Sequence, residues 1–222
     1  MLRGDRRGRR GGADADEVDT AGLPTTLRGR RVVLRPLRAS DWAAWNEVRV
    51  RNGTWLTKWE PAVPAGRADP SVERHAYLAR CAGSDREWQS GVGFGFGVFV
   101  TNIDEQQLVG EVRLGHVHRG SQQSAYLGYW IDQAVAGQSL MPEAVAVALW
   151  FSFEHAGLHR VQISIIPRNT ASRRVVEKLG LREEGTALRY IEINGVWEDH
   201  LRFAITAEEW TQRRDELLAA WC

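Results

Sequence analysis

The alternation of apolar and polar residues divides the chain into short segments that predict strands and helices. Runs typical of strands cover residues 31–37, 91–100, 107–114, 126–131, 161–166, 182–193 and 196–205. Helical spacing of apolar residues follows Ser40 and recurs over residues 71–81, 140–154, 169–179 and 206–221. A strand-helix-strand unit at 126–166 lies between two groups of consecutive strands. This order predicts an α/β protein with one mixed sheet, antiparallel early and late and parallel in the middle.

Composition indicates a domain boundary and argues against nucleic acid and membranes as partners. Five of the first ten residues are arginine and acidic residues follow among glycines, so we expect a disordered tail at 1–22 and one domain at 23–222. A net charge of +1 gives no general reason to expect nucleic acid. Cys81 and Cys222 lie far apart and no apolar run reaches membrane-spanning length. We therefore expect a cytoplasmic protein without membrane contact.

The turn between the strand at 126–131 and the helix from Leu140 is the first candidate for chemistry. The first N–H groups of a helix have no partner within it, and the helix dipole makes that end partly positive. Small residues at Ala134, Ala136, Gly137 and Ser139 would let the main chain approach a bulky anion. The turn predicts a pyrophosphate site, and the same pattern also fits an ordinary turn capped by Ser139.

The chain around this turn resembles the GNAT acetyltransferases, and more closely their RimJ/RimL branch of ribosomal-protein N-terminal acetyltransferases. The residues that carry the resemblance are Trp130-Ile131-Asp132 and the segments at 34–37, 55–61, 136–144, 167–172, 177–181 and 194–200. The likeness covers roughly residues 27–210. It implies the GNAT fold, a largely antiparallel sheet of six to seven strands with helices on both faces and a splayed central parallel pair. The family's motif Arg/Gln-x-x-Gly-x-Gly/Ala falls on Ala134, Gly137 and Ser139, so only the central glycine matches.

The resemblance implies acetyl-CoA as cofactor. Its pyrophosphate would lie on the main-chain N–H groups of 134–140, and its pantetheine arm would lie where the neighbouring parallel strand splays away. Asn169 would hold the arm and fits a plain helix N-cap equally well. The cofactor residues so implied are Tyr129, Trp130, Ile131, Ala134, Val135, Ala136, Gly137, Gln138, Ser139, Leu140, Met141, Asn169 and Ser172.

Acetyl transfer to an amine requires a base and a proton for the departing thiolate. An α-amino group titrates near pH 8, so a carboxylate acting through water suffices. Glu111 and Glu192 are both candidates for this base, and the sequence does not separate them. Ser172 stands where this branch carries a serine near the cofactor sulfur, so we expect it to stabilise or protonate the thiolate. A helix serine facing solvent is the alternative for Ser172.

The acceptor site is predicted from aromatic residues. Its candidate residues are Trp55, Trp59, Glu60, Phe94 and Tyr190. The resemblance implies that the acceptor is the N-terminal amine of a protein, such as a ribosomal protein. Alternatives are a small amine such as an aminoglycoside, polyamine or amino sugar, and a non-catalytic module that binds acyl-CoA or the ribosome. We expect no metal site, because His116 and His118 have no third ligand nearby, and a monomer or homodimer.

Overall fold

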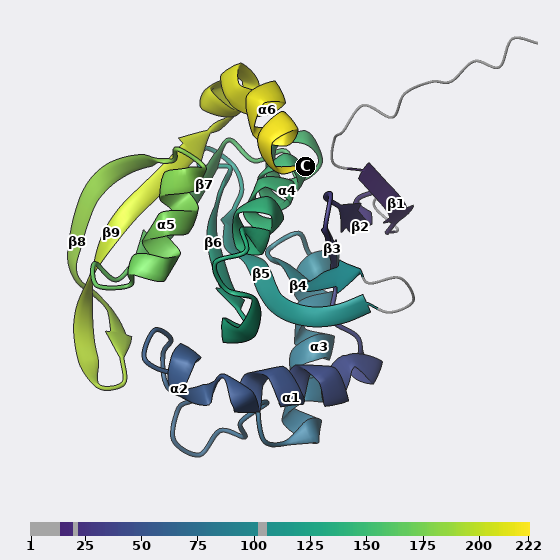
Figure 1. The fold of residues 1–222 in the computed structure, drawn as a ribbon, viewed down its shortest axis with the longest axis vertical. Helices are drawn as coiled ribbons and strands as arrows, with labels where there is room; N and C mark the ends of the chain where they lie inside the picture. Colours follow the sequence, from purple (N-terminus) through teal and green to yellow (C-terminus); the bar gives the residue numbers. More distant parts are fainter. Residues whose placement is uncertain (1–13, 20–21, 102–105) are drawn as a thin grey trace, which may run out of the picture.

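A twisted mixed sheet runs through the molecule, and helices cover both of its faces (Figure 1). The computed structural model describes residues 14–19, 22–101 and 106–222. Within them the sheet has nine strands in the order β1-β2-β3-β4-β5-β6-β7-β9-β8, and only β6 and β7 pair in parallel. The strands are β1 Asp14–Val18, β2 Pro24–Arg28, β3 Val32–Arg35, β4 Phe94–Thr101, β5 Gln106–His118, β6 Ser124–Ile131, β7 Arg160–Ile165, β8 Arg182–Ile193 and β9 Val196–Thr206.

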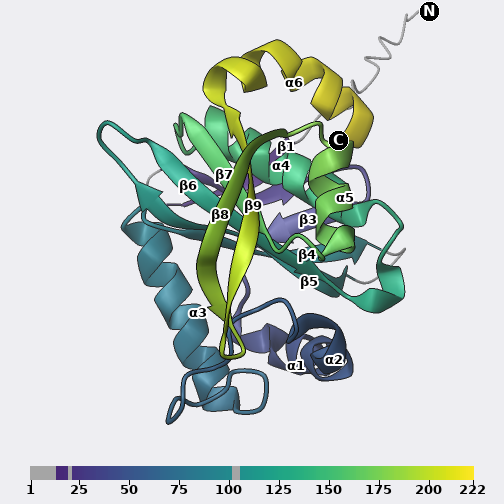
Figure 2. The ribbon, with the colours of Figure 1, turned by 90° about the vertical axis from the view of Figure 1, so that its left-hand side faces the viewer.

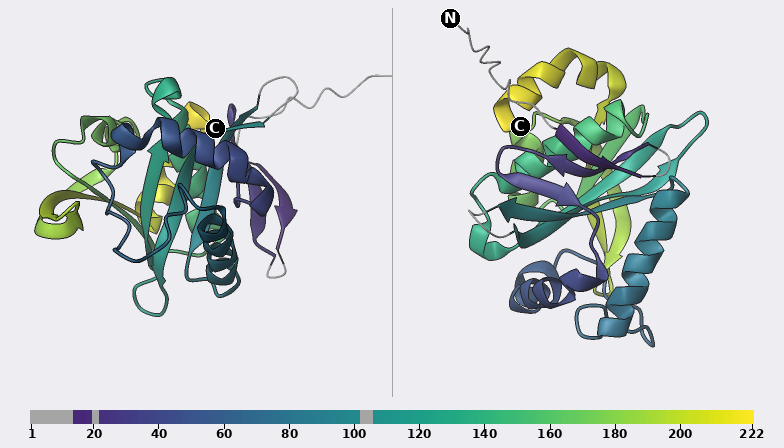
Figure 3. Two further views of the ribbon diagram at one scale, coloured as in Figure 1. Left: turned by 90° about the horizontal axis from the view of Figure 1, so that it is seen from below. Right: turned by 90° about the vertical axis from the view of Figure 1, so that its right-hand side faces the viewer.

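The helices form two groups, one on each side of the sheet (Figure 3). On one side lie η1 Ala39–Asp41, α1 Trp42–Arg51, α2 Gly53–Leu56 and α3 Arg74–Gln89; on the other lie α4 Leu140–Glu154, α5 Thr170–Lys178 and α6 Ala207–Trp221. Residues 140–152 of α4 are all buried, as expected for a helix that is apolar on every side. Helix α4 is therefore the centre of the core, and the short turn η2 Gln133–Val135 leads into it.

The predicted parallel pair and its splay are confirmed. Strands β6 and β7 pair only at Ser124–Arg160, Ala125–Val161 and Tyr126–Gln162. Beyond Tyr126 the two strands diverge, and β7 continues in register with β9 alone. Main-chain polar groups on the facing edges of β6 and β7 therefore have no strand partner there, and such groups must bond to something else.

The N-terminal part of the sheet differs from our expectation. Strands β1 and β2 add two strands to the six or seven predicted, and β1 pairs antiparallel with β2. Asp14–Val18, which fall within the predicted tail, form β1, while residues 1–13 and 20–21 of that tail lie outside the described residues. Residues 102–105, between β4 and β5, also lie outside the described residues. Helix α3 begins and ends later than the predicted 71–81.

The hairpin of β8 and β9 bends away from the sheet and reaches the side of α2 (Figure 2). Asn194, in its turn, donates from its side-chain amide to the carbonyl of Thr57 at 2.6 Å. Asn194 and Gly195 both have positive φ angles, 51° and 83°, which is the conformation of a tight two-residue hairpin turn. The hairpin is thereby fastened next to the loop that follows α2. Among the residues placed here, no helix has the length and apolarity needed to cross a lipid bilayer.

Candidate active site

A cavity of about 870 Å³ opens beside the gap between β6 and β7. It lies between α1 and α2 on one side and the β6–α4 loop and α5 on the other. Fifteen of the predicted site residues line it: Trp55, Trp59, Glu60, Glu111, Tyr129, Trp130, Ile131, Val135, Ala136, Gly137, Ser139, Leu140, Met141, Asn169 and Ser172. The fold thus brings together residues from four distant parts of the chain.

The β6–α4 loop offers a narrower set of free N–H groups than expected. The N–H of Ala134 donates to the Asp132 side chain at 3.1 Å, and those of Val135 and Ala136 donate to carbonyls within the loop. Gln138 donates to the carbonyl of Val135 at 3.4 Å. The loop uses these groups because it folds into η2, which Asp132 caps. The predicted cradle at 134–140 is therefore wrong in extent, and neither Ala134 nor Gln138 lines the cavity.

The remaining N–H groups are those that enter α4. The main-chain N–H groups of Gly137, Ser139, Leu140 and Met141 have no hydrogen-bond partner among the residues that the structure describes. Gly137 and Ser139 have φ angles of 84° and 62°, a left-handed conformation that turns successive N–H groups toward one side. Ser139 makes no side-chain cap on α4, so the alternative of an ordinary capped turn is wrong. Four unsatisfied donors at the positive end of a long helix form a site for an anion.

Two cations support this loop from outside. Arg31 donates to the carbonyls of Gln138 and Ser139 at 2.9 and 3.2 Å. Lys178 of α5 donates to the hydroxyl of Ser139 at 2.7 Å and lines the cavity together with Arg174. These contacts hold the two carbonyls away from the cavity and add positive charge at its rim. Arg31 lies 107 residues from Gln138 in the sequence, so the local pattern around the loop did not indicate this contact.

Arg31 is itself held by a carboxylate in the core. Glu143 is 1% exposed and accepts from the main-chain N–H groups of Arg31 and Val32 at 2.6 and 3.1 Å. It also accepts from Arg31 Nε at 2.9 Å. A buried carboxylate is stable only when its oxygens are satisfied in this way. Glu143 therefore joins the start of β3 to the first turn of α4.

Glu111 is the one candidate base that the fold places in the cavity. It is 6% exposed, its Oε1 accepts from the indole N–H of Trp45 at 2.5 Å, and its Oε2 forms an ion pair with Arg80. The two donors, which sequence reasoning missed, fix the orientation of the carboxylate. Glu192 is exposed on β8 opposite Trp197 and does not line the cavity, so its assignment as base is not supported.

Aromatic rings and arginines form the wall on the α1–α2 side. The guanidinium of Arg49 lies 5.8 and 5.2 Å from the ring centroids of Trp45 and Trp130 and forms an ion pair with Glu60. Trp55 and Trp59 line the same wall. These residues border a pocket, as expected. Glu60 is not a free carboxylate, because Arg49 pairs with it.

Two predicted acceptor residues lie elsewhere. Phe94 is fully buried, and its ring packs edge-on against Trp88 and Phe151 at 5.1 Å, so its assignment to the acceptor site is wrong. The alternation of glycine and phenylalanine in β4 instead allows α3 to lie close, since a Cβ on Gly95 would stand 3.1 Å from Ser84 Oγ. Tyr190 lies outside the cavity, where its ring meets His200 edge-on at 5.7 Å and faces the guanidinium of Arg202 at 4.9 Å.

The α5 side of the cavity is organised by Asn169, Ser172 and Tyr129. Asn169 Oδ1 accepts from the N–H of Ser172 at 3.1 Å, so Asn169 is the N-cap of α5. Tyr129 donates its hydroxyl to the carbonyl of Ser172 at 2.8 Å, and burial raises the pKa of Tyr129. The hydroxyl of Tyr129 therefore stays protonated at neutral pH, and it positions the first turn of α5 against β6. Ser172 is half-buried at the cavity wall rather than turned to solvent.

A buried polar contact joins the two sides of the cavity. Asn52 follows α1, is 1% exposed, and donates to Asp132 Oδ1 at 2.8 Å while it accepts from the N–H of Gln133 at 2.9 Å. Arg51 forms an ion pair with the same Asp132. Burial alone would raise the pKa of Asp132, but hydrogen bonds from Arg51 and Asn52 outweigh it and lower that pKa.

Comparison with known proteins identifies this arrangement. A family model described as an acetyltransferase (GNAT) domain matches residues 31–182. The chain belongs to the GNAT acetyltransferase family. This GNAT chain is 32% identical over 186 residues to the [ribosomal protein uS5]-alanine N-acetyltransferase of Escherichia coli, which covers 83% of this chain and 92% of that protein.

Solved structures agree with this GNAT assignment. The Mycobacterium smegmatis RimJ in complex with CoA-disulfide is 35% identical, with a TM-score of 0.77 over 86% of this chain and 91% of that one. The ribosomal-protein-S5-alanine acetyltransferase of Vibrio fischeri is 27% identical, with a TM-score of 0.74 over 83% of this chain and 98% of that one. Within the part of this GNAT chain that the structure covers, no three His, Cys, Asp or Glu residues are grouped as metal ligands.

Proposed function

We propose that this acetyltransferase moves an acetyl group from acetyl-CoA to the N-terminal α-amine of a polypeptide, with a ribosomal protein as the leading candidate. The observation that carries the proposal is the gap between β6 and β7, which adjoins four unpaired N–H groups at the start of α4. The named relatives support the acceptor, because two of them act on ribosomal-protein alanine. One solved relative contains coenzyme A as its disulfide.

The residues present fit coenzyme A. The N–H groups of Gly137, Ser139, Leu140 and Met141 would hold the pyrophosphate, since they are unpaired and lie at a positive helix end. The edge of β6 from Tyr129 to Ile131 has no strand partner toward β7 and would take the amides of the pantetheine arm. A Cβ added at Gly137 would meet nothing within 4 Å, so there is open space above the loop. When bound, the cofactor supplies an activated thioester.

Glu111 is the proposed base. An α-amino group has a pKa of about 8, so about a quarter of it is already neutral at pH 7.5, and one carboxylate can take the proton from the rest through water. Trp45 and Arg80 keep the carboxylate of Glu111 in one orientation toward the cavity. Ser172 would donate a hydrogen bond from its hydroxyl to the departing thiolate. Its N–H is used by Asn169 and its carbonyl by Tyr129, whereas its hydroxyl has no partner among the described residues.

The charge of the cavity favours a polypeptide over a polycationic small molecule. Of the lining carboxylates, Glu60 and Glu111 each form an ion pair with an arginine, which leaves Asp69. The lining cations are Arg49, Arg80, Arg113, Arg174 and Lys178. An aminoglycoside or polyamine needs several free carboxylates, and a single α-amine does not. The cavity chemistry therefore supports an acceptor with one amine.

The test is thiol release from acetyl-CoA in the presence of a panel of amines. Peptides with N-terminal alanine should be acetylated, and the same peptides with a blocked N-terminus should not. Turnover of aminoglycosides or polyamines in preference to peptides would replace the proposed acceptor. Binding of acetyl-CoA by calorimetry without thiol release for any amine would point instead to a non-catalytic module.

A further inference from the structure

A second cavity continues from the first along the face of the sheet. Its volume is about 510 Å³, and Arg113 and Gly128 line both cavities. The remaining lining residues are Glu87, Val92, Gly115, His116, Val117 and Tyr126. The function proposed above uses none of them, and none was singled out by sequence as an acceptor residue.

Two glycines, Gly115 and Gly128, leave part of the floor of this second cavity without side chains. Strands β5 and β6 pair there, with Arg113 opposite Gly128 and Gly115 opposite Tyr126. A Cβ on Gly128 would meet nothing within 4 Å, and a Cβ on Gly115 would first meet Arg113 Nε at 3.6 Å. The glycines therefore leave space rather than satisfy a tight contact. A bare strand surface of this kind admits the close approach of another backbone.

A bulge in β5 directs His116 to the wall of this cavity. The register of β5 against β6 shifts between Gly115 and His118, and His116 has a φ angle of 50°. Such a left-handed conformation is unfavourable for a residue with a side chain and is typical of sites where its direction matters. The wall of the second cavity thus contains a residue held in a costly conformation.

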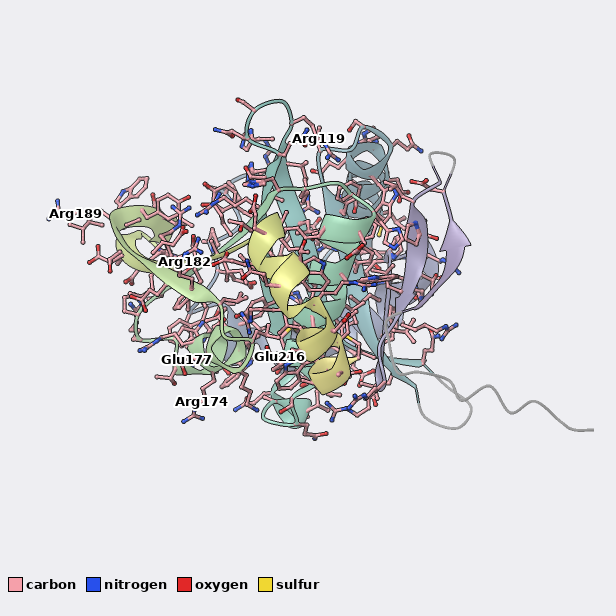
Figure 4. All side chains as sticks on the ribbon, turned by 90° about the horizontal axis from the view of Figure 1, so that it is seen from above. Arg119, Arg174, Glu177, Arg182, Arg189 and Glu216 are labelled. Atoms are coloured by element: carbon pink, nitrogen blue, oxygen red, sulfur yellow. The ribbon has the colours of Figure 1, made fainter. Side chains whose placement is uncertain are left out.

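The junction of the two cavities carries donors and acceptors. Arg113 forms an ion pair with Glu87 of α3, and both side chains are 39% exposed. Because the pair is partly hydrated, the guanidinium can donate to a carbonyl and the carboxylate can accept from an N–H of a chain laid across it. Arg174, at the rim of the first cavity, and Arg119, two residues beyond Val117, lie on opposite sides of the molecule (Figure 4).

From these features we infer that the second cavity binds the acceptor polypeptide in extended form, beyond its first two residues. The inference rests on the proposed function and adds that recognition extends beyond the terminal amine. Four residue steps separate Glu111 from Gly115 along β5, a length of about 13 Å that an extended peptide spans with about four residues. The second cavity therefore contacts residues at about positions three to five of the acceptor.

The experiment compares acetylation of a peptide series of two to eight residues with a common N-terminus. In the wild-type protein kcat/KM should rise at least tenfold from the dipeptide to the pentapeptide and then level off. Gly115→Val fills the cavity, and in this variant the rise should disappear while the dipeptide value stays within twofold of wild type. Gly83→Val is the matched control, since Gly83 lines neither cavity and its Cβ would meet only Arg86, at 3.9 Å.

A second variant protects the test against misfolding. Val92→Trp introduces bulk at the other wall, where the side chain is 46% exposed, and should give the same result as Gly115→Val with an unchanged thermal midpoint. A wild-type protein that gains nothing beyond the dipeptide, or a gain that survives in both filled variants, overturns the inference and leaves the proposed function intact. Failure to acetylate any peptide, dipeptide included, overturns the proposed function itself and the inference with it.

Discussion

Arg31 and Glu143, 112 residues apart, are joined side chain to side chain at 2.9 Å and again through the Arg31 main-chain N–H at 2.6 Å. Through this pair the guanidinium is placed on the carbonyls of Gln138 and Ser139. The pair therefore positions the loop whose N–H groups are proposed to bind the pyrophosphate, without touching the reacting atoms.

Replacing Arg31 with Gln should weaken acetyl-CoA binding about tenfold, which corresponds to about 1.4 kcal/mol. The reason is that the carbonyls of the loop lose their support, while the chemistry at Glu111 is unchanged. Calorimetry should show the higher Kd, and kinetics should show a raised KM for acetyl-CoA with a similar kcat. Arg30→Gln is the control, because Arg30 donates to Ala219 and does not contact the loop. Equal effects of the two variants would contradict the positioning role.

Gly137→Ala tests the left-handed loop directly. An alanine at a φ angle of 84° costs about 1–2 kcal/mol and will shift the loop, so the affinity for acetyl-CoA should fall. Gly195→Ala is a close match, with a φ angle of 83° and likewise nothing within 4 Å of its Cβ. Both variants should lose similar stability in urea unfolding, and only Gly137→Ala should raise the Kd for acetyl-CoA. A loss of acetyl-CoA affinity in both variants would contradict the proposal that this loop binds the cofactor.

Glu111→Gln separates the two candidate bases. The amide keeps the shape of the side chain but cannot take a proton, so kcat/KM for a peptide should fall about 100-fold or more. Glu192→Gln should stay within twofold of wild type, because Glu192 is exposed on β8 outside the cavity. Acetyl-CoA affinity should be unchanged in both. A large loss in Glu192→Gln alone would reverse the assignment.

Ser172→Ala should lower kcat by about 10- to 100-fold, the value of one hydrogen bond of about 1.5–3 kcal/mol to a charged atom. The fold of the α5 start should persist, because Asn169 and Tyr129 bond the main chain of Ser172 and not its hydroxyl. Thr170→Ala, at an exposed position outside the cavity, is the control. An unchanged kcat would remove Ser172 from the mechanism.

Asp132→Asn should reduce the free energy of unfolding at pH 7 by about 2 kcal/mol, since it removes the charge that bonds Arg51 and Asn52. The pKa of Asp132 is lowered in the folded state, so its contribution is complete above the ordinary carboxyl pKa of about 3.9 and is lost as the pH falls through the lower folded value. Urea unfolding from pH 3 to 7 should show a constant difference between variant and wild type above pH 5 that shrinks below pH 4. A difference at pH 3 as large as the one at pH 7 would refute this account.

Local patterns predicted the parts of the fold whose signals are local. The apolar run of α4 and the strands β6 and β7 are recognisable because their period and their flanking turns lie within a few residues. The order of these elements then limits the topology, and the splay between β6 and β7 followed from the family resemblance. Strand β2 was missed because PTTLR has no clear alternation and its pairing with β1 and β3 is a tertiary contact.

The details of the site could not be read from the sequence, because they depend on contacts between residues that are far apart in the chain. Trp45 and Arg80 meet Glu111 across 66 and 31 residues. Phe94 was misassigned because an alternating glycine–phenylalanine strand does not tell which of its faces the core covers. The loss of four N–H groups from the cradle depended on the turn that Asp132 caps, and nothing short of coordinates distinguishes a donor used inside a loop from a free one.

Asn52 contacts Asp132 and Gln133, directly after β6, through both its donor and its acceptor. The wall formed by α1 and α2 and the loop between β6 and α4 are therefore held by the same side chain. Because Asn52 also ends α1, one buried amide side chain fixes the position of that helix relative to the loop that leads into α4.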